Sequence, residues 1–396
     1  MSDNKEMQIS FKQIVKANLR NYSMFIMLAV IVIGFALLTN SVNINARNIT
    51  NIFIQNSYIL VLAVGMVLVI ILGNIDLSVG SVAAITGALG AMIYNTGIGI
   101  VFTILLTMII GAGIGCFQGV FIAYVKIPAF IVTLAGMLLF RGLTYIVTNV
   151  TPISLRDDHF RDIASGSISP SFLQVGGLHL LPLLLGLLLL VVYIVYAYRD
   201  RVKKKNNQFQ ILPIGYFIFK MAILSSVVLL LCLKFAQYRG LPTVFVVLAI
   251  TVGIFVFVTN NTIFGRYVYA VGGNARSAKL SGINSEQVIF FVHVIMGALA
   301  GLSGIVFTAY MNSALPQAGN LFELDAIAAC FIGGASASGG IGTIIGAITG
   351  GLVMGVINNG MSLMNIGADW QYVVKASVLL LAVCYDIYTR KKSGIV

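Results

Sequence analysis

The sequence LVLAVGMVLVIILGNIDLSVGSVAAITGALGAM, from Leu60 to Met92, decides the fold class of this chain. A membrane-spanning α-helix needs about 20 apolar residues to cross roughly 30 Å of hydrocarbon. This tract is longer than that, and it is interrupted only by the polar stretch GNIDLSVGS at 73–81. The alternating segments of about 10 residues that a membrane barrel requires are absent from the chain. The sequence therefore predicts membrane-spanning helices.

The amino-acid composition also indicates an integral membrane protein. Of the 396 residues, 59% are hydrophobic and 9% are charged, whereas soluble domains have about 25% charged residues. The formal net charge is +12, but the basic residues lie in short loops between apolar runs rather than in one patch. This distribution favours anchoring to membrane lipid and disfavours a nucleic-acid partner.

Twelve apolar runs are candidate spans, and the fold class that they predict is an all-α polytopic membrane protein with 10–12 transmembrane helices. The runs are 22–38, 52–72, 76–95, 98–124, 128–149, 178–198, 212–236, 242–260, 287–310, 326–347, 344–363 and 370–388. The runs 326–347 and 344–363 overlap in a glycine-rich segment, which leaves open whether one of them is broken or re-entrant.

Glycine repeats at every fourth residue in two of these runs. Because little hydrophobic force acts between helices in lipid, small residues that allow close backbone approach provide the packing. We therefore expect close helix contacts at Gly111, Gly115 and Gly119, and at Gly342, Gly346 and Gly350.

Positive charge orients the chain, because short loops rich in Lys and Arg remain in the cytoplasm. This rule places the N-terminal segment 1–21, the basic loop 199–211, the polar loop 261–286 and the tail 391–396 in the cytoplasm. Two cytoplasmic termini require an even number of crossings. The segment 150–177 carries mixed charge with Pro, Ser and Gly, and we expect it outside, as a landing surface for an external partner. Residues 22–390 are then a single transmembrane domain.

Asp76 is the clearest ionisable residue inside an apolar tract. Such a residue costs at least about 2.5 to 3.5 kcal/mol on insertion scales, so it needs a structural or functional role. In one interpretation Asp76 is the N-cap of the second of two helices joined by a tight turn. In the other, the helix breaks within the membrane and its polar residues line a substrate path. The cap explains the order Asp, Leu, Ser without further assumptions, and both interpretations remain open.

The other polar residues in apolar runs also have two interpretations. Glu323 and Asp325 precede the run that starts at Ala326, where they would favour the N-terminal dipole of that helix. Asn358 and Asn359 lie deep in an apolar run and either form hydrogen bonds across helices or meet a polar ligand. No cluster of His, Cys and carboxylate residues has the spacing of metal ligands, so the sequence predicts neither a metal nor a cofactor.

The segment VGGNARSAKLSGI, from Val271 to Ile283, is a polar and basic loop between two apolar runs. Its glycines superficially resemble a phosphate loop, but the chain contains no GxxxxGK[ST] motif and lacks the third glycine of a dinucleotide fingerprint. The sequence therefore predicts no nucleotide site and no enzymatic activity of its own. Uphill transport by such a chain would need either an ion gradient or a separate ATPase subunit.

The same segment resembles the cytoplasmic coupling segment of the ribose, xylose and multiple-sugar permeases of ABC importers. The resemblance continues, in the family's order, at GNIDLSVGSVAA (73–84), KIPAFIVTLAGMLLFRG (126–142) and ELDAIAACFIGGASASGGIGTIIGAITGGLVMGVINNG (323–360). The extra residues from about 199 to 237 are similar to those of the xylose and multiple-monosaccharide branch. The resemblance implies a fold similar to that of the cobalamin-type (type II) importer permeases.

The resemblance also implies a function and partners. It implies a permease subunit that moves a monosaccharide, such as xylose, galactose, arabinose or ribose, into the cytoplasm across the inner membrane of a bacterium. The implied partners are an ATPase subunit with two nucleotide-binding cassettes, an extracytoplasmic sugar-binding protein and a second copy of the permease. A short helix in the polar loop would dock on the ATPase and move as a lever.

Two sets of residues follow as candidate sites. We expect ATPase coupling at Gly273, Asn274, Arg276, Lys279, Ser281 and Gly282. We expect the translocation path at Asn74, Asp76, Ser78, Asn358 and Asn359.

Three alternatives belong to other functions. An ion-gradient-driven solute carrier would use Asp76 as its ion site. Nucleoside and autoinducer permeases share the fold and much of the motif set. A membrane enzyme acting on lipid-linked sugars would need paired carboxylates, and the only acidic cluster, at 157–162, lies among arginines on the expected outer side.

Overall fold

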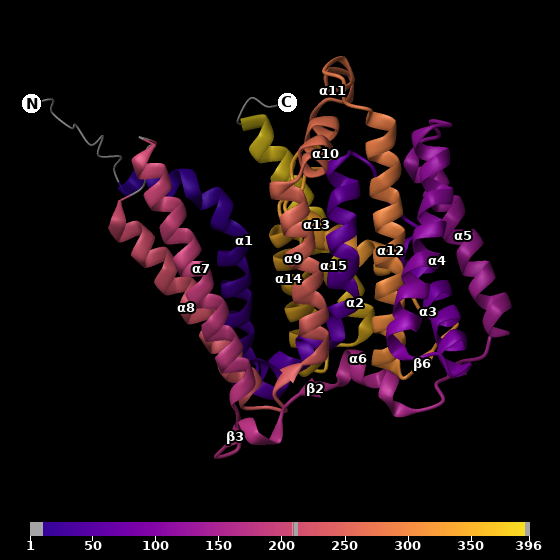
Figure 1. Ribbon diagram of the computed structural model, residues 1–396, viewed down its shortest axis with the longest axis horizontal. Helices are drawn as coiled ribbons and strands as arrows, with labels where there is room; N and C mark the ends of the chain where they lie inside the picture. The colour runs from indigo at the N-terminus through magenta and orange to yellow at the C-terminus, as the bar shows by residue number, and fades with distance from the viewer. Residues whose placement is uncertain (1–10, 208, 210–212, 393–396) are drawn as a thin grey trace, which may run out of the picture.

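The computed structural model describes residues 11–207, 209 and 213–392, and these residues form a bundle of long α-helices (Figure 1). Parts of four predicted segments lie outside the described residues: 1–10 of the N-terminal segment, 208 and 210–211 of the basic loop, 212 of the following span, and 393–396 of the tail.

The helices of more than ten residues are α1 (Phe11–Leu38), α2 (Ala46–Ile71), α3 (Val79–Asn95), α4 (Ile100–Ala123), α5 (Ala129–Thr148), α7 (Leu180–Asn206), α8 (Ile214–Ala236), α9 (Thr243–Asn261), α10 (Ile263–Gly273), α12 (Ser285–Met311), α13 (Phe322–Ile332), α14 (Ile344–Leu363) and α15 (Ala368–Lys392). The shorter elements are η1 (Val42–Ile44), η2 (Asp158–Arg161), α6 (Asp162–Ser165), η3 (Ser171–Leu173), α11 (Ala275–Leu280), β1 (Ile153–Ser154), β2 (Ser167–Ile168), β3 (Gln174–Val175), β4 (Leu178–His179), β5 (Leu241–Pro242) and β6 (Ser313–Ala314). The strands form three antiparallel pairs, β1–β6, β2–β5 and β3–β4.

Eight of the described helices are long and apolar enough to cross a membrane, namely α2, α4, α5, α7, α8, α9, α12 and α14. Residues Met24–Leu38 of α1 and the whole of α3 are shorter apolar helices. These helices confirm the predicted fold class, an all-α polytopic membrane protein.

The centre of the bundle is formed by α2, α12 and α14. In these helices 78%, 67% and 72% of the most apolar window is buried, against 17% in α7 and 6% in α8. Residues 59–71 of α2 are apolar on every side and are surrounded by α9, α12, α13 and α14. A helix of this kind is stable only inside a core. In contrast, α7 and α8 pack mainly on each other at the edge of the bundle (Figure 1).

Glycine allows the central helices to approach closely, as predicted. A Cβ added to Gly111 of α4 would collide with the carbonyl of Gly297 on α12. In the same way, a Cβ on Gly346 of α14 would collide with the carbonyl of Gly333, which follows α13. Gly115 and Gly350 meet the carbonyls of His293 and Ala329 in the same way, so close helix contacts are confirmed in both repeats, whereas Gly342 lies in the loop before α14.

Of the two overlapping runs, 326–347 is the broken one, because the helix in this region ends at Ile332. Gly334, Gly339 and Gly340 in the following loop have positive φ angles, which residues with a Cβ rarely adopt. The eleven-residue helix α13 is about 16 Å long at 1.5 Å per residue, roughly half of a hydrocarbon layer. The glycine-rich run is therefore a half-length helix and a loop, followed by the separate helix α14.

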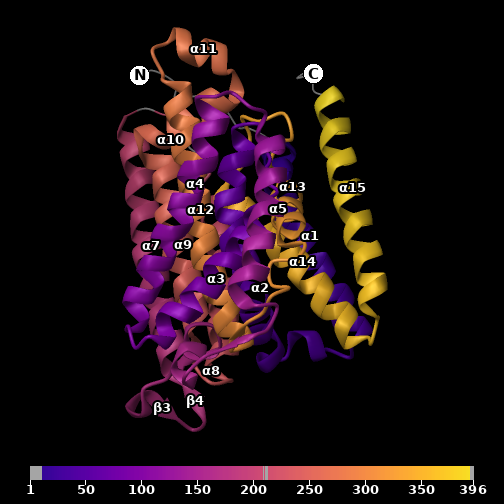
Figure 2. The same ribbon diagram turned by 90° about the vertical axis from the view of Figure 1, so that its right-hand side faces the viewer.

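The two ends of the bundle differ (Figures 1 and 2). The short helix α11, the first residues of α1 and the last residues of α15 lie at one end, which we call the α11 end. The helix α6 and the strand pairs lie at the other, the α6 end.

Candidate functional site

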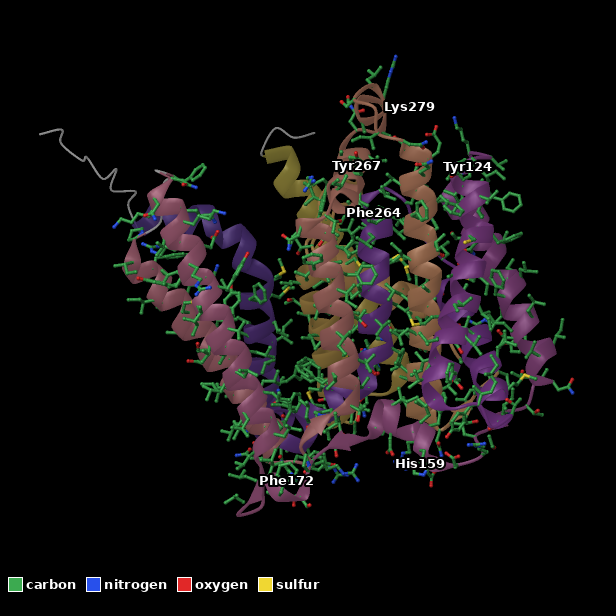
Figure 3. All side chains as sticks on the ribbon, viewed as in Figure 1. Tyr124, His159, Phe172, Phe264, Tyr267 and Lys279 are labelled. Carbon is green, nitrogen blue, oxygen red and sulfur yellow. The ribbon has the colours of Figure 1, made fainter. Side chains whose placement is uncertain are left out.

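The helix α11 projects from the bundle at the α11 end, and α10 links it to the core (Figure 3, where Phe264, Tyr267 and Lys279 are labelled). Each of them begins at a side-chain cap. The Thr262 hydroxyl accepts the N–H of Gly265, and the Asn274 Oδ1 accepts the N–H of Ser277 at 2.9 Å. Gly282 has a φ of 84° in the turn after α11. The segment 263–283 is thus an ordered helical projection, which we call the α10–α11 projection.

Most of the tip of this projection is exposed. Leu280 is 84% exposed, and Gly273, Asn274, Arg276, Ser281 and Gly282 are exposed as well. No ion pair within the described residues includes Arg276, whereas Lys279 is 3.0 Å from Glu286 at the start of α12. Lys279, one of the residues expected to couple to the ATPase, thus also forms an exposed ion pair with the start of α12 in this structure. Arg276 and Leu280 remain available at the tip.

The base of the projection is joined to the core around the carbonyl of Ile71, the last residue of α2. The N–H of Gly340 donates to this carbonyl at 2.8 Å, and a Cβ on Gly272 of α10 would collide with it. The Tyr269 hydroxyl donates to the carbonyl of Gly342 at 2.7 Å. A movement of α10 would therefore reach the end of α2 and the loop 333–343 directly.

Asp76 lies in the non-helical connection between α2 and α3, and it is 2% exposed. Its Oδ1 accepts the Ser78 N–H at 2.8 Å and the Ser78 hydroxyl at 2.6 Å. The helix α3 starts at Val79 with Ser78 as its N-cap. The expectation that Asp76 is the N-cap was therefore wrong in position, since Asp76 stabilises the turn that precedes the helix.

The network around Asp76 extends to α4 and α12. The Gln118 amide of α4 donates to the Ser78 hydroxyl at 2.8 Å, and His293 of α12 lies within electrostatic range of Asp76. The His293 Nδ1 lies 2.9 Å from the Ile289 carbonyl, and its Nε2 is buried without a hydrogen-bond partner among the described residues. Neither Gln118 nor His293 was a predicted site residue, because a single polar residue in an apolar run gives no indication of its partner.

The start of α3 lies inside the bundle rather than at its surface. Gly80 is 15 residues from Asn95, the α6-end terminus of α3, which corresponds to about 22 Å. A Cβ on Gly80 would collide with the carbonyl of Gly319 and with the Glu323 carboxylate. The beginnings of α3 and α13 therefore meet within the bundle, as do the broken helices of many transporters.

The predicted path residues do not form one site. Asn359 of α14 and Asn48 of α2 donate to each other's amide oxygens, at 2.9 and 2.7 Å. Asn48 is 23 residues from Ile71 along α2, or about 34 Å, so the asparagines are far from Asp76. Asn359 thus has the predicted inter-helix bond, whereas the Asn358 Oδ1 is buried and unpaired in the described residues. Asn74 is half-buried, and its N–H donates to the Val69 carbonyl.

The segment 150–177 is folded at the α6 end. Phe160 and Ala164 are fully buried there. The Tyr94 hydroxyl donates to Asp157 at 2.6 Å, and Arg156 lies 3.0 Å from the same carboxylate. The Tyr94 hydrogen bond, with smaller contributions from the His159 N–H and Arg156, holds the pKa of Asp157 below its ordinary value. His159 and Phe172 lie on the outer surface of this segment (Figure 3).

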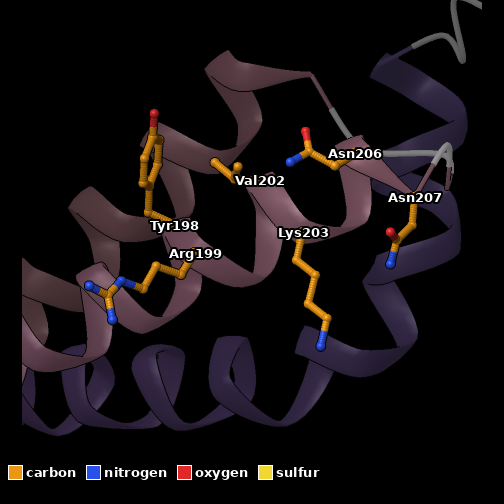
Figure 4. A pocket seen from close by; sticks show the side chains of 6 residues that line it. All are labelled: Tyr198, Arg199, Val202, Lys203, Asn206 and Asn207. Atoms are coloured by element: carbon orange, nitrogen blue, oxygen red, sulfur yellow. The ribbon is translucent and has the colours of Figure 1, made fainter.

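A pocket of about 420 Å³ lies at the α11 end of α7, away from the network around Asp76 and from the Asn48–Asn359 pair. Figure 4 shows its lining residues, which are Tyr198, Arg199, Val202, Lys203, Asn206 and Asn207. A basic cluster next to an apolar span is typical of contact with anionic lipid headgroups.

Known proteins of one family match this chain along nearly its whole length. A family model described as "branched-chain amino acid transport system / permease component" matches residues 48–383. The xylose transport system permease protein XylH of Haemophilus influenzae is 38% identical over 95% of this chain and 98% of its own length. XylH of Escherichia coli K12 is 37% identical over 94% of each chain, and the ribose import permease protein RbsC of the same strain is 33% identical over 92% of each. No solved structure matches.

Proposed function

Since the chain belongs to the family of branched-chain amino acid transport system permease components, we propose that it is the membrane subunit of an ABC importer for a monosaccharide. The support for a sugar comes from the relatives, which are named as xylose and ribose permeases. ATP hydrolysis would take place on a separate ATPase subunit with two nucleotide-binding cassettes. An extracytoplasmic sugar-binding protein would deliver the substrate to a pair of permease copies.

The single observation that carries the proposal is the α10–α11 projection. It is exposed at its tip, capped at both helix starts, and joined at its base to the end of α2 and the loop 333–343. A rigid element of this kind transmits a displacement instead of absorbing it. Docking of an ATPase at Arg276 and Leu280 would move α10 against Ile71 and alter the connection that holds Asp76.

This proposal also fixes an orientation. The α11 end would face the cytoplasm of a bacterium and the α6 end the outside of its inner membrane. Both termini would then be cytoplasmic. The folded segment 150–177 would be the landing surface for the sugar-binding protein.

The proposal is tested by reconstitution in liposomes. The purified permease, its ATPase subunit and its binding protein should accumulate radiolabelled D-xylose or D-ribose only when ATP is present on the ATPase side. The permease alone, with a sodium or proton gradient, should accumulate neither sugar. Accumulation under that gradient without ATP would overturn the proposal.

An ion-gradient-driven carrier is the second candidate, because two carboxylates lie in the interior of the bundle. Asp76 and Glu323 are both buried, and Glu323 Oε2 has no hydrogen-bond partner among the described residues. A buried carboxylate of this kind can bind a coupling ion. The gradient arm of the same experiment separates the two candidates.

A further inference from the structure

Four ionisable side chains gather where the chain re-enters the bundle between α12 and α13. They are Arg141 of α5, Glu323 and Asp325 of α13, and Lys375 of α15. Arg141 donates to the carbonyl of Ala318. The Lys375 Nζ lies 3.0 and 3.1 Å from the two carboxylate oxygens of Asp325. Charged groups inside spans are rare, and they are typical of a substrate pathway.

The backbone that carries these groups reaches deep into the bundle. Ala314 pairs with Ile153 at the α6 end, and from there the chain runs without regular structure up to Leu321. At Gly319 and Glu323 it meets Gly80, about 22 Å from the α6 end of α3. Irregular backbone at such a depth occurs only where protein covers it or where it lines a water-filled space.

The Asp325–Lys375 pair is only partly covered by the chain. The two side chains are 22% and 21% exposed, and Leu324 between Glu323 and Asp325 is 45% exposed. The helices α4 and α9, whose outward faces are apolar, contain no charged residue at all. A charged side chain that faces lipid is energetically unfavourable. The surface around this pair therefore differs from the apolar outward faces of α4 and α9.

The helix α15 is held at the edge of the bundle next to this pair. Its contacts are chiefly with α13 and α14, and Val374 and Val378 pack near Ala328. Figure 2 shows α15 as the outermost helix on this side. Among the described residues, the Asp325–Lys375 ion pair is a polar contact that joins α15 to α13.

We propose that the surface formed by α13 and α15 borders an aqueous path, and that Asp325 and Lys375 contact a neutral polyhydroxylated solute there. This inference rests on the proposed function and names the part of the chain that meets the sugar. A carboxylate accepts and an ammonium donates hydrogen bonds to hydroxyl groups. Because the pair has no net charge, it favours a neutral solute over an anion or a cation.

The first test measures water access to this surface. In a full-length chain with Cys116, Cys232, Cys330 and Cys384 replaced by alanine, Leu324→Cys is compared with Ile250→Cys, a residue of α9 that is 58% exposed. During ATP-driven turnover of the complex, a charged, water-soluble thiol reagent should modify the cysteine at 324 at least tenfold faster than the cysteine at 250. Equal rates at the two positions would overturn the proposal.

The second test measures contact with the solute. Asp325→Asn and Lys375→Gln should each lower D-xylose or D-ribose uptake about tenfold, while ATPase activity stimulated by the binding protein changes less than twofold. Asp200→Asn removes an exposed ion pair with Lys204 on α7 and should leave uptake unchanged. The exchange Asp325→Lys with Lys375→Asp keeps an ion pair between the helices. Uptake should stay low in this exchange, and its return to the wild-type value would show a purely structural pair and overturn the contact.

The two tests also separate this inference from the proposed function. If the wild-type complex moves no sugar with ATP, the proposed function fails. The labelling rate at position 324 still decides whether the surface borders water, because it does not depend on which solute is carried.

Discussion

The packing around the Ile71 carbonyl depends on the absence of a side chain at Gly272. Gly272 and Gly273 are adjacent, but only the first lies against the main chain of another helix. A methyl group at 272 would collide with the Ile71 carbonyl, whereas one at 273 has nothing within 4 Å. These neighbours thus form a matched pair for measuring how tightly the base of the projection is packed.

We predict that Gly272→Ala lowers the free energy of unfolding by about 1 to 3 kcal/mol, the usual cost of overpacking. Gly273→Ala should change it by less than about 0.5 kcal/mol, as expected for an open surface position. Equilibrium unfolding of the purified protein in detergent measures both values. Equal losses in the two variants would contradict the packing described at Ile71.

Asp157 gives the folded segment 150–177 a defined dependence on pH. Because its folded pKa lies below the unfolded value of about 3.9, its contribution to stability is complete above that value and is lost as pH falls through the folded pKa. We predict that the docking of residues 155–165 is constant from pH 7 to about 5 and weakens below about pH 4. Amide hydrogen exchange, corrected for its intrinsic pH dependence, measures this. In Asp157→Asn this acid-induced loosening should be absent, and equal loosening in both proteins would contradict the prediction.

At the scale of elements, α11 depends on its cap, since six residues are too few to form a stable helix alone. Asn274→Ala removes the acceptor for the Ser277 N–H and should destabilise α11 by about 1 kcal/mol. We therefore expect the number of sugars taken up per ATP hydrolysed to fall several-fold.

The control for the cap is Asn274→Asp, which keeps a side-chain oxygen at the same place. It should retain most of the coupling measured in proteoliposomes. If the aspartate and alanine variants lose coupling equally, the amide itself contacts the ATPase and the cap is not the reason for the loss.

Most helices could be predicted from the sequence because a membrane requires long apolar runs. The runs 52–72 and 98–124 lie within a few residues of α2 and α4, apart from the polar first turn of α2. The sequence left open which of the overlapping runs 326–347 and 344–363 is broken, because apolar composition is the same in a continuous helix and in a half-helix with a glycine loop. The glycine pairs at 333–334 and 339–340 are a local signal for a break, but the hydrogen bond from the Gly340 N–H to the Ile71 carbonyl of α2 could not be predicted from them.

The buried networks could be predicted only in part. Asp76 and Ser78 are close in sequence, and the structure confirms that they are close in space. The partner of Asp325 is Lys375, 50 residues away, and Gln118 reaches Ser78 from 40 residues away. An ionisable residue in an apolar run is a visible signal, and Arg141 and Lys375 could have been singled out by it. Their partners could not, because pairing across the bundle depends on how the helices pack.

At the scale of the whole molecule, transport would require the projection and the interior to move together. Gly282 closes the turn after α11 with a φ of 84°, and nothing lies within 4 Å of an added side chain. A residue with a Cβ is strained at this φ. A larger residue at position 282 would therefore change the shape of the turn without colliding with any neighbouring residue.

We predict that Gly282→Leu lowers uptake per ATP hydrolysed at least tenfold while membrane insertion stays intact. Gly215→Leu is the control, since this glycine of α8 also has open space around it but lies in a regular helix. Uptake and ATP hydrolysis measured in the same proteoliposomes give the ratio. Unchanged uptake in Gly282→Leu would remove the turn from the coupling mechanism.

The pairing of β2 with β5 has a consequence for how this chain can be altered. Ile168 faces Leu241 in that pairing, and the residues between them include the edge hairpin α7–α8, which is mostly exposed. The two points where the hairpin leaves and rejoins the body are therefore held side by side. A short turn could therefore replace the exposed part of the hairpin, or a fluorescent domain could be grafted there, if Phe235, which packs on Phe53 of α2 and Phe245 of α9, is kept.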